Sequence, residues 1–342
     1  MKKIIVTGGN GFIGSNLVKF LLKKKFFVIN IDKSKYSNGS YLLKNINKKN
    51  YKFFKLDINS KQILKIIFKY KPLAIFNLAA ETHVDRSIDN PKVFIESNIL
   101  GTFNLLEQIK KYKKKYSKNL KFIHISTDEV YGDLKKNDRS NEKSSYNPSS
   151  PYSATKASAD HLIKSYTRTY GLETIISNCC NNFGPGQFPE KLIPTLIFKI
   201  LNNQPLPIYG NGLNSREWIH VDDHCKGLFA ILKRGKKGES YNIGTGNNIN
   251  NLNLTKLLLR IVRDKRITLG KKVKIKFVKD RPGHDLRYAL DSKKIKKNLK
   301  WKPEKKFEIG LEETLIWYFE NYDFFKKFSK KKFFKRLGLK ND

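Results

Sequence analysis

An apolar run that leads directly into closely spaced glycines is the feature that most restricts how this chain can fold. Lys3–Thr7 is apolar at its centre, and Gly8, Gly11 and Gly14 follow it. From Phe12 to Lys24 the apolar residues recur at helical spacing. The sequence therefore predicts a buried strand, a tight turn and a helix. Glycines at such a turn let a phosphate approach the start of the helix, where free N–H groups and the helix dipole favour an anion.

Strand-like and helix-like segments alternate over about the first 180 residues. This alternation predicts an α/β fold with a doubly wound parallel (Rossmann) sheet. Pro and Gly become frequent after Asn181, which predicts a smaller, irregular α+β domain. We expect a dinucleotide-binding domain at 1–178, with 218–246 returning to it, and a domain at 179–342 that mainly binds the substrate. The expected strands are Lys3–Thr7, Phe27–Asp32, Tyr51–Leu56, Leu73–Leu78, Phe122–Ser126 and Glu173–Asn178, and the expected helices include Phe12–Lys24, Pro91–Lys111 and Ala154–Tyr170.

Asp32 ends the second expected strand, 18 residues after Gly14. A carboxylate at this place can accept hydrogen bonds from the ribose hydroxyls of NAD, and it would repel the extra phosphate of NADP. Lys33 and Lys35 weaken that repulsion. The pattern favours NAD over NADP.

Tyr152 and Lys156 are four residues apart in a segment with helical spacing, so they share one face of the helix. A nearby ammonium favours the phenolate and lowers the pKa of the tyrosine from its usual value of about 10. Tyr152 could then take a hydroxyl proton while hydride leaves the same carbon. With the glycine turn upstream, the pair indicates hydride chemistry and not merely two residues on an exposed helix.

Two adjacent acids, Asp128 and Glu129, follow the strand expected at Phe122–Ser126. Ligands bind at this end of the strands in open α/β sheets. Eliminating water needs one group that removes a proton from carbon and another that protonates the departing hydroxyl. Two acids in one cleft can have their pKa values pushed apart, which makes one the base and the other the acid. A surface acidic turn is the alternative, and the neighbouring cofactor residues argue against it.

The chain is strongly basic, with 69 Lys and Arg against 30 Asp and Glu and a formal net charge of +39. Such a charge can attract nucleic acid or anionic membranes. Only 11 of the 69 are Arg, and the Lys residues are spread along the chain, with runs such as 113–115 and 330–332. This distribution is typical of solvated surfaces, because a specific nucleic-acid site would need clustered Arg and aromatic side chains. We expect no specific nucleic acid as a partner, and a positive field that recruits an anionic substrate.

No apolar stretch approaches the ~20 residues that span a bilayer, and the first strand begins at once without a signal peptide. We therefore expect a cytoplasmic protein that does not bind membranes. The three cysteines, Cys179, Cys180 and Cys225, have neither a disulfide pattern nor zinc spacing. They are expected to be small core residues, and no metal is expected.

The glycine spacing with Tyr152 and Lys156 resembles the extended short-chain dehydrogenase/reductase superfamily. With the two acids added, the chain resembles the dTDP-glucose 4,6-dehydratase family from Met1 to about Tyr322. Cys180, Phe183 and Glu217 depart from its usual residues, as does the stretch Thr245–Asn251. The resemblance rests on Leu78–Ser87, Ser126–Gly132, Pro148–Tyr152, Asn178–Pro185, Phe188–Lys191 and Arg281–Asp285.

The resemblance implies roles for residues at matching positions. Thr127 would contact the hexose, Asp128 would be the acid at the C6 hydroxyl, Glu129 the base at C5, and Tyr152 with Lys156 would act at C4. NAD would be held by Gly8, Gly11, Phe12, Ile13, Gly14, Asp32, Lys33, Asp57, Ile58, Leu78, Ala79, Ala80, Thr82, Ser97, Tyr152, Lys156 and Asn182. The nucleotide sugar would be bound by Thr82, His83, Thr127, Asn181, Lys191, Pro207, Ile208, Tyr209, Arg216, Asn251, Arg281 and His284.

The implied reaction converts dTDP-glucose to dTDP-4-keto-6-deoxy-glucose, on the route to rhamnose and related deoxysugars. It oxidises C4, eliminates water across C5 and C6, and returns hydride to C6, so that NAD is not consumed. The resemblance also implies a homodimer through the helices at Pro91–Lys111 and Ser153–Tyr170. The alternatives are a dehydratase of UDP- or CDP-linked sugars, an epimerase or decarboxylase of the same fold, and a nucleic-acid-binding protein that kept the fold.

Overall fold

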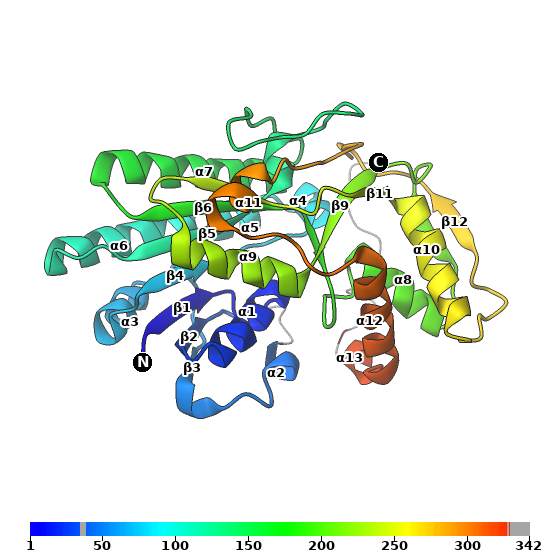
Figure 1. Cartoon of the computed structure of the whole chain (residues 1–342), viewed down its shortest axis with the longest axis horizontal. Helices are drawn as coiled ribbons and strands as arrows, with labels where there is room; N and C mark the ends of the chain where they lie inside the picture. Colours follow the sequence, from blue (N-terminus) through cyan, green and yellow to red (C-terminus); the bar gives the residue numbers. More distant parts are fainter. Residues whose placement is uncertain (35–38, 327, 329–342) are drawn as a thin grey trace.

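A parallel sheet of seven strands organises the N-terminal part of the protein, and the predicted doubly wound α/β fold class is confirmed (Figure 1). The computed structural model describes residues 1–34, 39–326 and 328, so that Lys35 and the run 330–332 lie outside the described residues. Each neighbouring pair of strands is parallel. The strand order is β10 (Ser240–Ile243), β6 (Thr174–Cys179), β5 (Lys121–Thr127), β4 (Ala74–Asn77), β1 (Lys3–Thr7), β2 (Phe27–Ile31) and β3 (Tyr51–Phe54).

Helices cover both faces of this sheet, because its central strands are apolar on both sides. One face packs against α1 (Phe12–Lys23), α9 (Val221–Arg234) and α11 (Lys293–Leu299). The other packs against α3 (Gln62–Tyr70), α6 (Gly101–Tyr116) and α7 (Pro151–Tyr170). The three cysteines are free and buried, as expected, and they lie in the core between the sheet and α9.

Smaller sheets and a second core form the other end of the molecule, around α8, α10 and α12 in Figure 1. One sheet has the order β11 (Asn248–Asn250), β9 (Ser215–His220) and β7 (Asn181–Phe183), and β8 (Leu206–Tyr209) pairs with β12 (Ile275–Val278). The helices here are α8 (Leu192–Leu201), α10 (Asn251–Asp264), α12 (Phe307–Glu320) and α13 (Asp323–Lys326). The short helices elsewhere are α2 (Gly39–Leu42), η1 (Lys48–Asn50), α4 (Val84–Asp89) and η3 (Asp128–Tyr131).

The segment 218–246 is shared between the two parts. Its first residues belong to β9 in the three-stranded sheet, whereas α9 and β10 lie against or within the large sheet. Helix α11, from much later in the chain, also packs on α9 and β10. The division into domains at residue 178 stays a prediction.

The helix predicted at Pro91–Lys111 is not one continuous α-helix. It consists of α5 (Lys92–Phe94), a wider π-helical turn η2 (Ile95–Leu100), and α6, which continues to Tyr116. The wide turn buries Asn98, whose amide bonds the backbone N–H and C=O of Glu81 at 2.9 and 3.1 Å. π-helical turns often occur at functional sites, and this one orients the chain beside the carboxyl end of β4. None of the helices in the described ranges has the length and apolar character needed to cross a membrane.

Candidate active site

A cavity of about 480 Å³ opens at the carboxyl ends of β1, β2, β4 and β5 and extends to β8 and β9. Its size is that of a ligand pocket. Every residue predicted to bind cofactor or substrate, or to act in catalysis, lies on its wall. The structure therefore brings together residues from Gly8 to His284, although their roles stay predictions.

The glycine turn packs closely against neighbouring backbone at one end of the cavity. Gly8 has a φ of +69°, and a Cβ there would lie 2.6 Å from the nitrogen of Ala79. A Cβ on Gly14 would lie 2.1 Å from the carbonyl oxygen of Gly8. Side chains at these two positions would therefore collide with backbone atoms, so the turn requires glycine at both. Gly11 is the N-cap of α1, so the free N–H groups of its first turn face this space.

Asp32 lies just beyond β2 at the wall of the cavity. Its carboxylate accepts hydrogen bonds from the backbone N–H groups of Asn10 at 3.0 Å and Ser34 at 2.6 Å. Burial raises the pKa of Asp32, and these hydrogen bonds act in the opposite direction. Lys33 beside it lies 3.8 Å from Asp57 and 3.5 Å from Glu81, so its charge is shared with two carboxylates. The arrangement suits ribose hydroxyls better than a second phosphate.

Tyr152 lies in the first turn of α7, whose start is encoded locally. Ser150 and Ser153 form a capping box, and Pro151 occupies the first helical position. Lys156 follows one turn later, and only 3% of its surface is exposed. Its ammonium donates to the carbonyl of Ile125 at 2.7 Å and lies 3.0 Å from Nε2 of His124.

The expected lowering of the Tyr152 pKa is not found in this arrangement. Burial raises the pKa of Tyr152 well above its usual value, and Glu129 adds to the rise, whereas the hydroxyl of Thr127 lowers it. The reason is geometric, because Lys156 directs its ammonium to His124 and to Ile125.

Asp128 and Glu129 begin the short helix η3 directly after β5. Thr127 caps this helix, and its hydroxyl accepts from the backbone N–H of Glu129 at 3.3 Å. The same hydroxyl donates to Oδ1 of Asp128 at 3.2 Å, and Oδ2 of Asp128 is buried without a hydrogen-bond partner. Both carboxyl groups line the cavity together with Tyr152.

The surroundings of the two acids differ in charge. Burial raises the pKa of Asp128 well above its usual value, and the carboxylates of Glu129 and Glu217 raise it further, whereas Arg216 and the hydroxyl of Thr127 lower it. Burial also raises the pKa of Glu129, but Arg281, Arg216 and Lys191 oppose that rise. The pKa of Asp128 is therefore raised more strongly than that of Glu129, so Asp128 holds its proton more readily than Glu129 does.

Cationic side chains line the half of the cavity near β8 and β9. Arg216 is buried, and its guanidinium carbon lies 4.4 Å from the ring centre of Tyr288. Arg281 forms an ion pair with Asp85 at 2.5 Å, and the hydroxyl of Tyr209 reaches the same carboxylate at 3.3 Å. Guanidinium groups in this setting suit a diphosphate.

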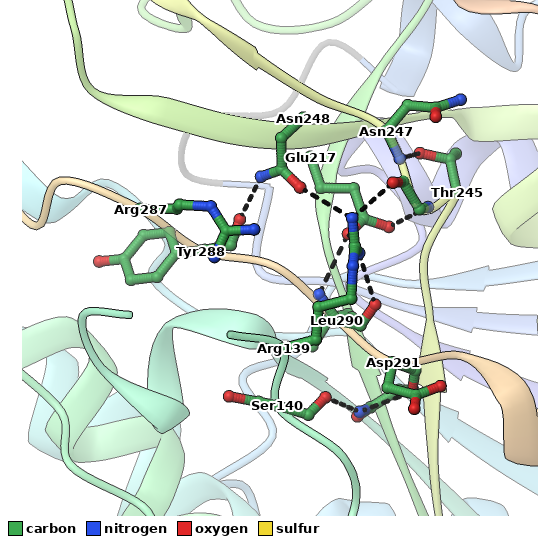
Figure 2. A network of polar contacts seen from close by, with 12 residues as sticks. Arg139, Ser140, Glu217, Thr245, Asn247, Asn248, Arg287, Tyr288, Leu290 and Asp291 are labelled. Carbon is green, nitrogen blue, oxygen red and sulfur yellow. Dashed lines mark hydrogen bonds and ion pairs between the residues drawn. The ribbon is translucent and has the colours of Figure 1, made fainter. Parts of the chain in front are cut away.

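A buried network around Glu217 holds this half of the cavity together (Figure 2). Glu217 is fully buried, and its carboxylate accepts from the backbone N–H groups of Gly246 at 2.8 Å and Leu290 at 3.0 Å. Arg139 donates to the same carboxylate at 3.2 Å and to the carbonyl of Leu290 at 2.9 Å. The network joins β9, which carries Arg216, to two loops and to the segment that follows η3.

Known proteins match this chain over nearly its whole length. A family model described as GDP-mannose 4,6 dehydratase matches residues 5–314. The dTDP-glucose 4,6-dehydratase of Escherichia coli is 46% identical over 346 residues, which cover 95% of this chain and 96% of that protein. The chain belongs to the dTDP-glucose 4,6-dehydratase family. This confirms the family predicted from the sequence.

Solved structures of this family share the fold. The dTDP-glucose 4,6-dehydratase of Streptomyces venezuelae, with NAD and dTDP bound, has a TM-score of 0.87 and 39% identity, covering 94% of this chain and 98% of its own. The enzyme from Bacillus anthracis, in complex with NAD, has a TM-score of 0.86 and 40% identity, covering 96% and 99%.

Several residues that line the cavity of this dehydratase-family chain were not predicted. Glu81, Asp85 and Glu190 lie within the segments that carry the resemblance, but nothing in their spacing distinguishes them from surface charges. Tyr288 has no signal in the sequence, because its contact with Arg216 depends on tertiary structure. Within the described residues, no group of three or more His, Cys, Asp and Glu side chains could hold a metal ion.

Proposed function

We propose that this chain is an NAD-dependent lyase that converts dTDP-glucose to dTDP-4-keto-6-deoxy-glucose and water. The observation that carries the proposal is the pair Asp128 and Glu129, which share one cavity with Tyr152 and differ in the number of cations that stabilise their ionised forms. Oxidation or epimerisation alone requires no such pair, whereas elimination of water requires both an acid and a base.

The glycine turn and Asp32 fit NAD. The turn can form because Gly8 and Gly14 have no Cβ to collide with neighbouring backbone; the free N–H groups at the start of α1 would bind the pyrophosphate, and Asp32 would bind the adenosine ribose. When bound, NAD accepts hydride from C4 of the sugar and later donates it to C6. Lys156 would hold the nicotinamide ribose, and the structures of relatives with NAD support this cofactor.

The first step is proton removal from the C4 hydroxyl. Tyr152 would be the base, although burial raises its pKa and the ammonium of Lys156 is directed to His124 and Ile125 in this structure. The C4 ketone that results makes the hydrogen on C5 acidic.

The second step eliminates water. Glu129, kept ionised by Arg281, Arg216 and Lys191, takes the proton from C5. Asp128, kept protonated by burial and by neighbouring carboxylates, gives its proton to the C6 hydroxyl, which leaves as water. After hydride reaches C6, Glu129 returns its proton to C5. One proton then has to pass from Tyr152 to Asp128, through solvent, before the next cycle.

The substrate would lie with its hexose beside Thr127 and its diphosphate among the guanidinium groups of Arg216 and Arg281. Lys191 hydrogen bonds the carbonyl of Thr82 at 3.0 Å, which places its ammonium at the entrance to the same half of the cavity. A second candidate is a dehydratase of another nucleotide sugar, because the cations bind the diphosphate and do not select the base.

Purified protein incubated with dTDP-, UDP-, CDP- and GDP-glucose, without added NAD, tests this function. We expect a 4-keto-6-deoxy product from dTDP-glucose, identified by mass and by the absorbance of the ketosugar in alkali. Product from only a UDP-, CDP- or GDP-linked sugar would overturn the substrate, and a C4 epimer without water loss would overturn the dehydratase assignment.

We also propose a homodimer that forms through η2, α6 and α7, which pack together. Ile95, Leu100 and Phe103 are large apolar side chains that are 46%, 50% and 44% exposed on the first two elements, and Tyr170 is 43% exposed at the end of α7. A second copy would cover them. Sedimentation equilibrium should give twice the chain mass, and Phe103→Glu should yield the monomer.

Location in the cytoplasm and a place on the route to rhamnose stay predictions.

A further inference from the structure

His124 and Asp160 are two buried titratable residues that the proposed mechanism does not use. His124 contacts Lys156, and Asp160 lies next to His124. Their exposed fractions are 1% and 0%, and that of Lys156 is 3%. Buried charged groups are costly unless they are paired and hydrogen bonded, so this arrangement requires an explanation.

The secondary structure places the three side chains together. Tyr152, Lys156 and Asp160 are spaced by four residues on α7 and are all buried against the sheet. His124 and Ser126 alternate along β5, so both point to the same face of the sheet, and both contact that helix.

The contacts form a chain from Lys156 to Asp160. The ammonium of Lys156 lies 3.0 Å from Nε2 of His124, and this nitrogen lies 3.7 Å from Oδ1 of Asp160. Oδ2 of Asp160 accepts from the hydroxyls of Ser126 at 2.7 Å and Tyr146 at 3.1 Å. Oδ1 of Asp160 is buried and has no hydrogen-bond donor among the residues that the structure describes. One oxygen of the carboxylate is therefore fixed by two hydroxyls, and the other is directed toward the His124–Lys156 pair.

We propose that Asp160 is the buried counter-charge that keeps Lys156 an ammonium, and that His124 is the neutral spacer between them. Both are positioning residues, because they act through Lys156. The inference rests on the proposed function for its effect on catalysis, but not for the interaction itself.

Burial raises the pKa of Asp160, and Lys156 is the largest of the effects that oppose this rise. Burial lowers the pKa of Lys156 to about 8, and Asp160 gives the largest opposing effect. Burial lowers the pKa of His124 well below its usual value, and Lys156 lowers it further, so the ring stays neutral. Without Asp160, Lys156 would lose its proton at a lower pH. The other titratable or charged groups that face Lys156 or Asp160 are Lys164 on α7, Cys179 on β6, Tyr131 on η3 and Tyr146.

The test is the pH profile of kcat/KM for dTDP-glucose with Asp160→Asn, which removes the charge and keeps the shape. We expect the alkaline limb, where Lys156 loses its proton, to move down by about one pH unit. Asp160→Glu should restore much of the shift. Tyr146→Phe removes a hydrogen bond to Asp160 without a change of charge, and it should leave that limb in place. The affinity of nucleotide-free protein for NAD, measured by calorimetry across the same pH range, should follow the same shift.

An alkaline limb that stays in place for Asp160→Asn, with activity lowered equally at every pH, would show a purely structural role and overturn the proposal. If Asp160→Asn folds poorly, denaturant unfolding of Lys156→Met, Asp160→Asn and the double variant replaces the profile. The double variant should then lose less stability than the two single changes add up to, and simple additivity would refute the pairing. This second measurement needs no turnover, so it stays informative even if the proposed substrate is wrong.

Discussion

Replacing Glu129 by Gln should separate the oxidation of C4 from the elimination of water. Gln has the same shape but cannot take a proton, so elimination should slow by about 10²–10⁴-fold, or about 3–5 kcal/mol in barrier height. Oxidation should survive, because the carboxylate of Glu129 is one of the groups that raise the pKa of Tyr152. Without that charge, the phenolate forms more readily.

The assay is rapid mixing of the variant with dTDP-glucose, followed by the absorbance of reduced nicotinamide. The reduced cofactor should accumulate in Glu129→Gln and stay low in the parent chain. Glu308→Gln is the matched control, because it makes the same chemical change at an exposed residue of α12, which forms a surface ion pair with Arg260 of α10. Normal turnover of Glu129→Gln would show that another group removes the C5 proton. Loss of cofactor reduction would show that Glu129 acts before elimination.

Four further predictions concern single groups. Tyr152→Phe should slow cofactor reduction in the same assay by about 10²-fold or more. An unchanged rate of reduction would show that Tyr152 is not the base. Asp128→Asn mimics the protonated acid, so calorimetry should find dTDP affinity unchanged while product formation slows by about 10²–10⁴-fold. Binding that is about tenfold tighter would indicate an ionised Asp128, because its negative charge would repel the diphosphate. Arg139→Met leaves Glu217 buried without its ion-pair partner. Because the Arg139 side chain is 34% exposed, we expect the free energy of unfolding in urea to fall by about 2–3 kcal/mol, which is less than the full cost of breaking a buried pair. Unchanged stability would contradict this expectation. Because burial raises the pKa of Glu129 above 4.5, kcat should fall as pH decreases through that raised value, and an acid limb at or below pH 4.5 would contradict the assignment.

The large sheet was predictable because its information is local. Each central strand is a short apolar run, and each covering helix carries apolar residues at a spacing of three and four. The π-helical turn in η2 was not predictable from spacing. It depends on Asn98 bonding the backbone of Glu81, 17 residues away in the sequence. The strands β7, β8, β9, β11 and β12 are three to six residues long, and their pairings are set by the tertiary structure.

The same distinction applies to the cavity. Gly8 to Gly14, Asp128 with Glu129, and Tyr152 with Lys156 are short motifs, so their chemistry could be inferred from the sequence. Other residues in and around the cavity are held by partners from distant segments, such as Asp85 for Arg281, 196 residues apart, and Arg139 for Glu217, 78 residues apart. The spacing of residues in one sequence does not predict such long-range pairs.

The two adjacent acids show why both levels are needed. The motif supplies two carboxyl groups but does not indicate which is the acid, because the sequence alone does not show which charged side chains surround each of them. The fold makes them different, since Arg281, Arg216 and Lys191 all favour the ionised form of Glu129, whereas Asp128 is influenced by Arg216 and by the carboxylates of Glu129 and Glu217. Those arginines come from β9 and from the loop after β12, which are also the segments that line the nucleotide half of the cavity. The groups that would bind the diphosphate are therefore the same groups that keep the base ionised, so substitutions at Arg216 or Arg281 should alter kcat as well as KM.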